Sequence, residues 1–123
     1  MNRARFEALV RRSLAESPAE FRRHLESVAI VVQERPTPEQ LRLWELDPDD
    51  ADLLGFYDGV PLTEGEDDAV VPRNDAIYVF QRAHEEMCAS ESELVDEIRR
   101  TVIHEVGHHF GLDDDRIDEL GFG

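Results

Sequence analysis

The sequence predicts an α+β protein, a small mixed sheet with packed helices, in a single domain that spans residues 1–123. A length of 123 residues suits one domain. Short β-branched or aromatic runs occur at three places, each flanked by polar, proline or glycine residues. A long amphipathic helix pattern lies near the C-terminus, so the expected order is helix, strand, helix, strand, strand, helix, with the last helix packed on one face of the sheet.

The first half of the chain has two expected helices before its first strand. Residues 3–15 place Phe6, Leu9 and Val10 on one helical face opposite arginines, and a second short helix is expected up to residue 26. The β-branched run at residues 28–32 predicts a strand that is buried on both faces. Thr37 is a suitable N-cap for a short helix over residues 38–44.

The second half holds the other strands and the long helix. Residues 53–57 and 76–80 are expected strands, and the acidic residues 63–69 between them are expected to form a loop. Ser90 and Glu93 form a capping-box pattern ahead of a helix over residues 92–110. Its apolar stripe recurs every four residues, at Leu94, Ile98, Val102 and Val106.

Composition limits the partners and the compartment. The net charge is −16; residues 1–23 contribute +3 and the remainder −19, which disfavours binding to nucleic-acid phosphates. The acidic surface is better explained by solubility than by attraction of basic peptides, although basic peptide substrates remain an alternative. No apolar run is long enough for a membrane span, and no signal-peptide pattern is present. The single cysteine, Cys88, fits a reducing compartment, so a cytoplasmic location is expected.

Residues 104–114, HEVGHHFGLDD, contain the motif H-E-x-x-H. On a helix, His104 and His108 lie one turn apart and can bind one metal ion through their imidazoles. Glu105 is rotated by about 100° from His104, which places it to hold and deprotonate a metal-bound water rather than to be a third ligand. The midpoint of the two histidines lies roughly 130° from the apolar stripe, so the pair should not point into the core.

A third ligand is expected after the helix ends. Gly111 can adopt the left-handed conformation that ends a helix, and the chain can then turn back so that Asp114 reaches the same ion. Asp113 and Asp115 remain alternatives for this ligand. Two histidines, one aspartate and a water would form a catalytic rather than a structural site, with one Zn²⁺ per chain.

Other candidate residues are better explained by packing or solvation. His109 projects onto the apolar stripe, and His84 is expected at the surface. Tyr57 and Tyr78 could orient a reaction intermediate, but sheet packing explains them better. Trp44 and Phe56 are expected in the core, together with other apolar side chains.

The motif and its surroundings resemble the minimal zincin-like metallopeptidases, small bacterial proteins with a C-terminal HExxHHFG signature. Besides residues 101–112, the resemblance rests on residues 28–36, on LLGFYDGVPL at 53–62, on residues 77–80 and on Leu120-Gly121. It implies a minimal zincin-like core with the metal-binding helix near the C-terminus. It also implies His104, His108 and Asp114 as metal ligands and Glu105 as the catalytic base, without a known substrate.

The function expected from these residues is zinc-dependent hydrolysis of a peptide bond. Both methionines precede His104, so the methionine turn of metzincins is absent, and nine residues follow Asp114. A substrate cleft would therefore have to come from the preceding strands, from residues 58–75 or from another subunit. This shortage motivates the alternative, a non-catalytic metal-binding or regulatory module on a zincin scaffold. Metal-dependent RNA cleavage is disfavoured by Glu105, by Asp114 in place of histidine, and by the negative charge.

Overall fold

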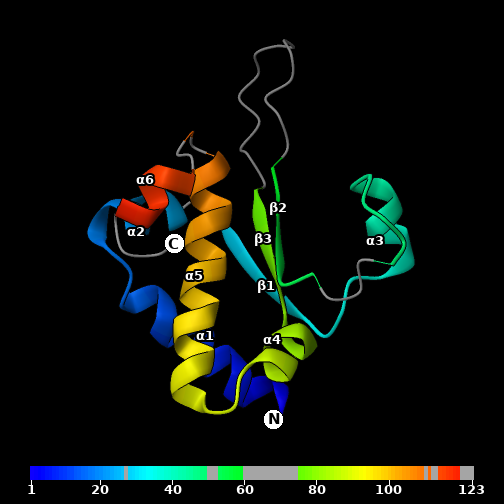
Figure 1. Cartoon of the computed structure of the whole chain (residues 1–123), viewed down its shortest axis with the longest axis horizontal. Helices are drawn as coiled ribbons and strands as arrows, with labels where there is room; N and C mark the ends of the chain where they lie inside the picture. Colours follow the sequence, from blue (N-terminus) through cyan, green and yellow to red (C-terminus); the bar gives the residue numbers. More distant parts are fainter. Residues whose placement is uncertain (27, 50–52, 60–74, 110, 112–113, 120–123) are drawn as a thin grey trace.

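The computed structural model of the chain describes residues 1–26, 28–49, 53–59, 75–109, 111 and 114–119 (Figure 1). The elements in these ranges are α1 (Arg3–Ala15), α2 (Ala19–Leu25), β1 (Ala29–Gln33), α3 (Pro38–Leu43), β2 (Gly55–Asp58), β3 (Ala76–Phe80), α4 (Gln81–Met87), α5 (Glu91–His109) and α6 (Asp114–Glu119). The α+β class is confirmed. The expected acidic loop at residues 63–69 lies outside the described residues.

The sheet is mixed, as predicted, and its strand order is β1-β3-β2. β1 pairs with β3 in parallel, with Ile30 opposite Ile77, and β2 pairs with β3 antiparallel, with Phe56 opposite Tyr78. β3 is therefore the central strand. The prediction that the first strand is buried on both faces is wrong: Ala29 is exposed and the rest of β1 is only partly buried, because β1 is at the edge of this sheet.

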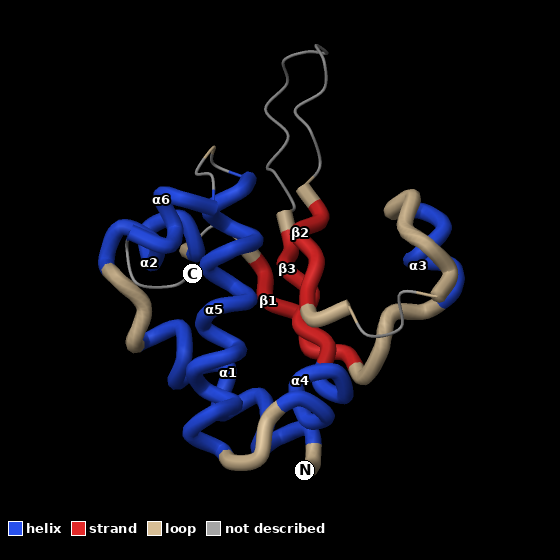
Figure 2. Tube along the Cα trace, in the orientation of Figure 1, coloured by secondary structure: helices blue, strands red, loops and turns tan. Residues whose placement is uncertain are grey.

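Helices cover one face of the sheet (Figures 1 and 2). α5 packs against β2 and β3, and α1, α2 and α6 pack against α5. α4 follows β3 without a connecting loop, and α6 forms where only a short tail was expected. Neither of these two helices was predicted. Within the described ranges, no helix is long and apolar enough to cross a membrane.

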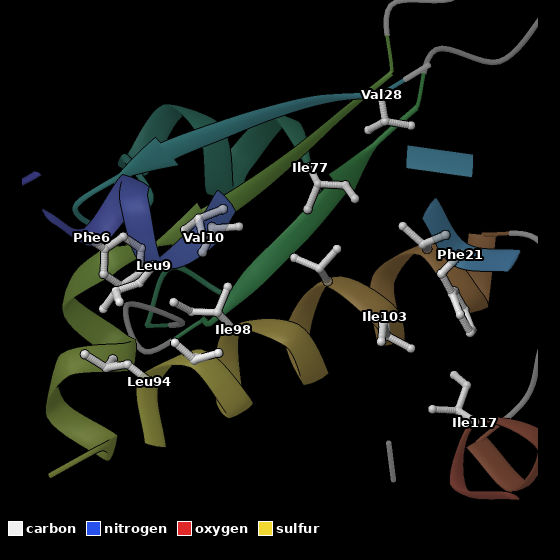
Figure 3. Close-up of a cluster of buried hydrophobic side chains, with 14 residues drawn as sticks. Phe6, Leu9, Val10, Phe21, Val28, Ile77, Leu94, Ile98, Ile103 and Ile117 are labelled. Carbon is white, nitrogen blue, oxygen red and sulfur yellow. The ribbon is translucent and has the colours of Figure 1, made fainter. Parts of the chain in front are cut away.

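The hydrophobic core lies between α5, the sheet and α1 (Figure 3). The four stripe residues of α5 are buried as predicted, and Ile98 and Val102 are fully so. Two more core residues, Val95 and Ile103, belong to α5 itself. The others come from α1, α2, β3, α6 and the residue before β1: Phe6, Leu9, Val10, Phe21, Ile77, Val79, Ile117 and Val28. α5 thus shares its apolar face with α1, α2, α6 and the sheet, and its other face is available for the site.

The opposite face of the sheet carries a separate aromatic cluster. Trp44, which follows α3, stacks on Phe56 with ring centroids 4.2 Å apart and also contacts Tyr78 at 5.1 Å. α3 therefore lies on the side of the sheet away from α5 (Figure 1). Trp44 and Phe56 are only partly buried, so the expectation that they join the main core is wrong.

Candidate active site

The motif residues lie at the C-terminal end of α5. The helix begins at Glu91, one residue before the predicted start, and Ser90 caps it: its Oγ accepts a hydrogen bond from Glu93 N at 3.2 Å. Glu93 in turn accepts one from Ala89 N at 2.7 Å. The capping box predicted from Ser90 and Glu93 is therefore present, and it determines the residue at which the motif helix begins.

His104 and His108 lie one turn apart with ring centroids 5.7 Å from each other and ring planes at 84°. His104 is partly buried and His108 is exposed, whereas Ile103 and Val106 beside them are buried in the core. The prediction that the pair faces away from the core is confirmed. Two imidazoles on one helical turn are donors that suit Zn²⁺, so these two side chains fit part of the site that the motif implies.

Glu105 is partly buried and faces strand β2. Its Oε1 accepts a hydrogen bond from the backbone N–H of Tyr57 at 3.0 Å. Burial raises the pKa of the Glu105 carboxyl, while the Tyr57 N–H and the neighbouring His108 and His104 act in the opposite direction. The carboxylate is therefore held at a defined place beside the two histidines, in an environment less polar than water.

The hydrogen bond between Tyr57 and Glu105 is possible because the Tyr57 N–H points away from β3. Phe80 N donates to Leu54 O at 3.0 Å, so Leu54 and the alternate residues Phe56 and Asp58 direct their backbone groups toward β3. In an antiparallel pair the alternate residues direct their backbone groups outward. The N–H groups of Gly55 and Tyr57 therefore lie on the outer edge of β2, the edge that Glu105 reaches.

Gly111, after the end of α5, adopts the predicted conformation. Gly111 has φ of +89°, in the left-handed region, and its N–H donates to His108 O at 3.1 Å. α6 then begins at Asp114. The side chain of Asp114 and the whole of Asp113 lie outside the described part of the chain, and Asp115 is exposed.

The described side chains alone do not complete a metal site. Among them, no group of three or more histidine, cysteine, aspartate or glutamate residues could hold a metal ion. That search did not include Asp114, the predicted third ligand. The choice between Asp113, Asp114 and Asp115 stays a prediction.

A cleft of about 360 Å³ opens beside the motif. It is lined by residues 53–55 on one side and by Glu97, Arg100, Thr101, His104 and Glu105 of α5 on the other. The cleft thus lies between the start of β2 and the helix that carries the motif. Of the three expected sources of a substrate cleft, the preceding strands do line this hollow, and its use by a substrate stays a prediction.

Several other sequence expectations can now be compared with the structure. His84 was expected at the surface, and this is wrong: it is 0% exposed, in α4 beneath α5. The Tyr57 hydroxyl donates to Asp75 Oδ2 at 2.7 Å, and Tyr78 lies in the aromatic cluster, which agrees with structural roles for both. Burial raises the pKa of the Cys88 thiol, which opposes thiolate reactivity. The side chain of His109 lies outside the described part.

Two features of the site had little sequence signal. One is the backbone N–H of Tyr57, which any residue except proline would provide. The other is Gly55, whose importance depends on a helix that is about fifty residues away in sequence. A glycine between Leu54 and Phe56, inside a strand pattern, indicates a close backbone approach, and this was the available clue.

The fold and the site together define a zincin-like protein. A family model of zincin-like metallopeptidases matches residues 25–123, and the chain belongs to this family. Members of the family generally bind zinc, and membership supports a peptidase role. A search of curated proteins finds no match.

Proposed function

We propose that the protein is a zinc-dependent peptidase in which His104, His108 and Asp114 hold the ion and Glu105 is the general base. The observation that carries this proposal is the position of Glu105. Its carboxylate lies at the boundary between the two imidazoles, the edge of β2 and the cleft. A base for hydrolysis needs this combination of a fixed position, partial burial and access to a substrate.

The chain's own residues divide the chemistry between them. When bound, zinc supplies a Lewis acid that polarises the scissile carbonyl and acidifies water. Glu105 takes the proton from the attacking water and later returns it to the leaving amine. The Tyr57 N–H orients Oε1, which leaves the second carboxylate oxygen for the proton transfer. Burial raises the pKa of the Glu105 carboxyl, which makes the carboxylate a better proton acceptor than one in water.

The cleft supports a peptide as the substrate. Its walls are apolar at Leu53 and Leu54, and Glu97 forms an ion pair with Arg100 at 2.7 Å on the helix side. A second hollow of about 330 Å³ also touches Leu54 and is lined by Ala83, Glu86 and Met87. An extended chain that lies along these two hollows would bring a backbone carbonyl close to Glu105. The net charge of −16 favours the approach of basic over acidic peptides.

Metal stoichiometry tests the ligand assignment. We expect one Zn²⁺ per chain in wild type after dialysis, and none in His108→Ala. Asp114→Ala should weaken binding far more than its matched controls Asp113→Ala and Asp115→Ala, because only the spacing of Asp114 from Gly111 favours a ligand. Full occupancy in His108→Ala would overturn the site, and equal effects at the three aspartates would overturn the third ligand.

Turnover tests the catalytic role. The zinc-loaded protein is incubated with an unbiased peptide library, and cleavage is followed by mass spectrometry. Glu105→Gln should retain zinc but lose activity by about 10²–10⁴-fold, because an amide cannot accept the proton. Asp96→Asn, a change at an exposed position of the same helix, is the matched control and should behave as wild type.

The same experiment separates the two candidate functions. If zinc-loaded wild type cleaves no peptide in the library, the non-catalytic metal-binding module is the better description. If Glu105→Gln cleaves as fast as wild type, the activity belongs to a contaminant or to another base. Faster cleavage of basic than acidic peptides at low salt, lost at high salt, would support the electrostatic preference.

A further inference from the structure

β2 approaches α5 unusually closely at Gly55. A Cβ atom at this residue would lie 2.7 Å from Thr101 Cγ2 and 3.0 Å from the carbonyl oxygen of Tyr78. Carbon atoms in normal contact are about 3.5–4.0 Å apart, so no side chain fits here without movement. Gly55 is not among the positive-φ glycines of the described residues. A glycine is needed at this position because a side chain would clash, and not because the backbone has a positive φ.

Thr101 is locked in the orientation that creates this constraint. Its Oγ1 lies 3.0 Å from Nε2 of His84, and Nδ1 of His84 lies 2.9 Å from the carbonyl oxygen of Phe80. His84 is fully buried, so no water can replace the threonine hydroxyl. With the hydroxyl held by His84, the methyl group is directed at Gly55. A rotation of Thr101 to make room there would break the buried hydrogen bond.

The distance between β2 and α5 at Gly55 also determines the hydrogen bond between Tyr57 N–H and Glu105. Glu105 is one helical turn after Thr101, and Tyr57 is two residues after Gly55 on the same edge of β2. The Glu105 Cγ atom lies 4.0 Å from where the Gly55 Cβ would be, and Tyr57 N donates to Glu105 Oε1 at 3.0 Å. The packing of Gly55 against Thr101 and the hydrogen bond from Tyr57 to Glu105 are therefore adjacent, and both depend on the distance between β2 and α5.

We propose that Gly55, Thr101 and His84 are positioning residues for Glu105. They set the separation of β2 and α5 at which the Tyr57 backbone N–H holds the carboxylate. A Cβ at residue 55 must move the strand by about 1 Å to reach normal contact. The same shift would stretch the 3.0 Å hydrogen bond beyond the range of about 2.7–3.2 Å that such bonds occupy. The catalytic part of this inference rests on the proposed function of Glu105.

Two substitutions and their combination test the proposal. Gly55→Ala should lower kcat by about tenfold to a hundredfold with little change in KM, because a misplacement of about 1 Å at a catalytic group can cost that much. Thr101→Ser keeps the hydroxyl for His84 and removes the obstructing methyl, so its own kcat is the reference for the double variant. The double variant Gly55→Ala/Thr101→Ser should recover most of the kcat, although the Tyr78 carbonyl contact remains.

A second readout does not depend on activity. In the metal-free protein, the Tyr57 amide should show slow hydrogen exchange and the chemical shift of an N–H that donates to a carboxylate. Gly55→Ala should lose both signatures, and the double variant should regain them. A loss of kcat without a change at the Tyr57 amide would mean a general structural effect and would overturn the proposal, as would the absence of rescue.

The outcomes also separate this proposal from the proposed function. If wild type cleaves peptides and Gly55→Ala cleaves equally well, positioning is wrong and the peptidase stands. If wild type cleaves nothing, the peptidase is wrong and the amide measurements alone decide the positioning. If Gly55→Ala does not fold, the double variant decides: recovery of the fold with the wild-type Tyr57 amide supports the proposal, and failure to fold or an altered amide overturns it.

Discussion

The buried hydrogen bond between His84 and Thr101 should make a measurable contribution to stability. In Thr101→Val the hydroxyl is replaced by a methyl group of similar size, so the packing of the side chain is retained. His84 Nδ1 faces the Phe80 carbonyl oxygen and must carry the proton in the neutral ring. Nε2 is therefore the acceptor and the Thr101 hydroxyl the donor. The substitution leaves Nε2 without a donor at a side chain that is 0% exposed.

An unsatisfied buried acceptor costs about 1–3 kcal/mol. His84→Leu removes the other partner and leaves the Phe80 carbonyl without its donor, while the Thr101 hydroxyl can turn to a carbonyl of its own helix. Because each single change already breaks the shared bond, the double variant should cost less than the sum of the two. A coupling energy of about 1 kcal/mol or more is expected for residues that share one buried bond.

Urea unfolding of the four metal-free proteins at pH 8 measures this coupling. For a small protein the free energy of unfolding falls by about 1–3 kcal/mol per molar urea, so a loss of 2 kcal/mol lowers the midpoint by roughly 1 M. A midpoint for Thr101→Val that equals wild type would refute the reasoning. Additive costs in the double variant would do so as well, since they would mean that the two side chains do not act through one bond.

Further predictions concern pH, the helix end and the buried acid. Burial lowers the pKa of His84, so below about pH 6.5 the unfolded chain binds a proton that the folded chain does not. The free energy of unfolding should therefore fall as the pH drops below that value. Urea midpoints at pH 8 and pH 5 should show a smaller loss in His84→Leu than in wild type. Gly111→Ala should cost about 1–2 kcal/mol because of the positive φ, and Gly111→Asn less, as thermal or urea midpoints would show; equal midpoints for glycine and alanine would contradict the left-handed turn. Burial raises the pKa of the Glu105 carboxyl, so the charged form is disfavoured; metal-free Glu105→Gln should be at least as stable as wild type at pH 7, and a lower urea midpoint would mean that the charge itself stabilises the fold.

The sequence predicted the parts of the site that depend on local signals. The helix that carries the motif runs over Glu91–His109, against an expected 92–110, because the Ser90 cap and the four-residue apolar stripe both act within one helix. Gly111 adopts the expected left-handed conformation because only its own backbone requires it. The orientation of His104 and His108 away from the core follows from the same periodicity.

What the sequence did not predict depends on contacts between distant segments. α4 follows β3 directly, so the change from strand to helix at Gln81 has no glycine or proline to mark it. His84 is polar, and its burial depends on two partners, Phe80 and Thr101, that only the fold brings together. β1 has the apolar pattern of a central strand but is at the edge, because the order of strands in a sheet is a property of the whole topology.

The helix α1 shows that the region of family similarity and the unit that folds have different limits. The family match begins at residue 25, after α1 has ended, yet α1 places Phe6, Leu9 and Val10 in the core at 0%, 1% and 3% exposure. At about 1.5–3 kcal/mol for each buried side chain, their loss would remove roughly 5–9 kcal/mol. This is comparable to the entire net stability of a typical domain, about 5–15 kcal/mol. A fragment of residues 25–123 would therefore contain the whole metallopeptidase signature but would expose the apolar surface on which its metal-binding helix rests.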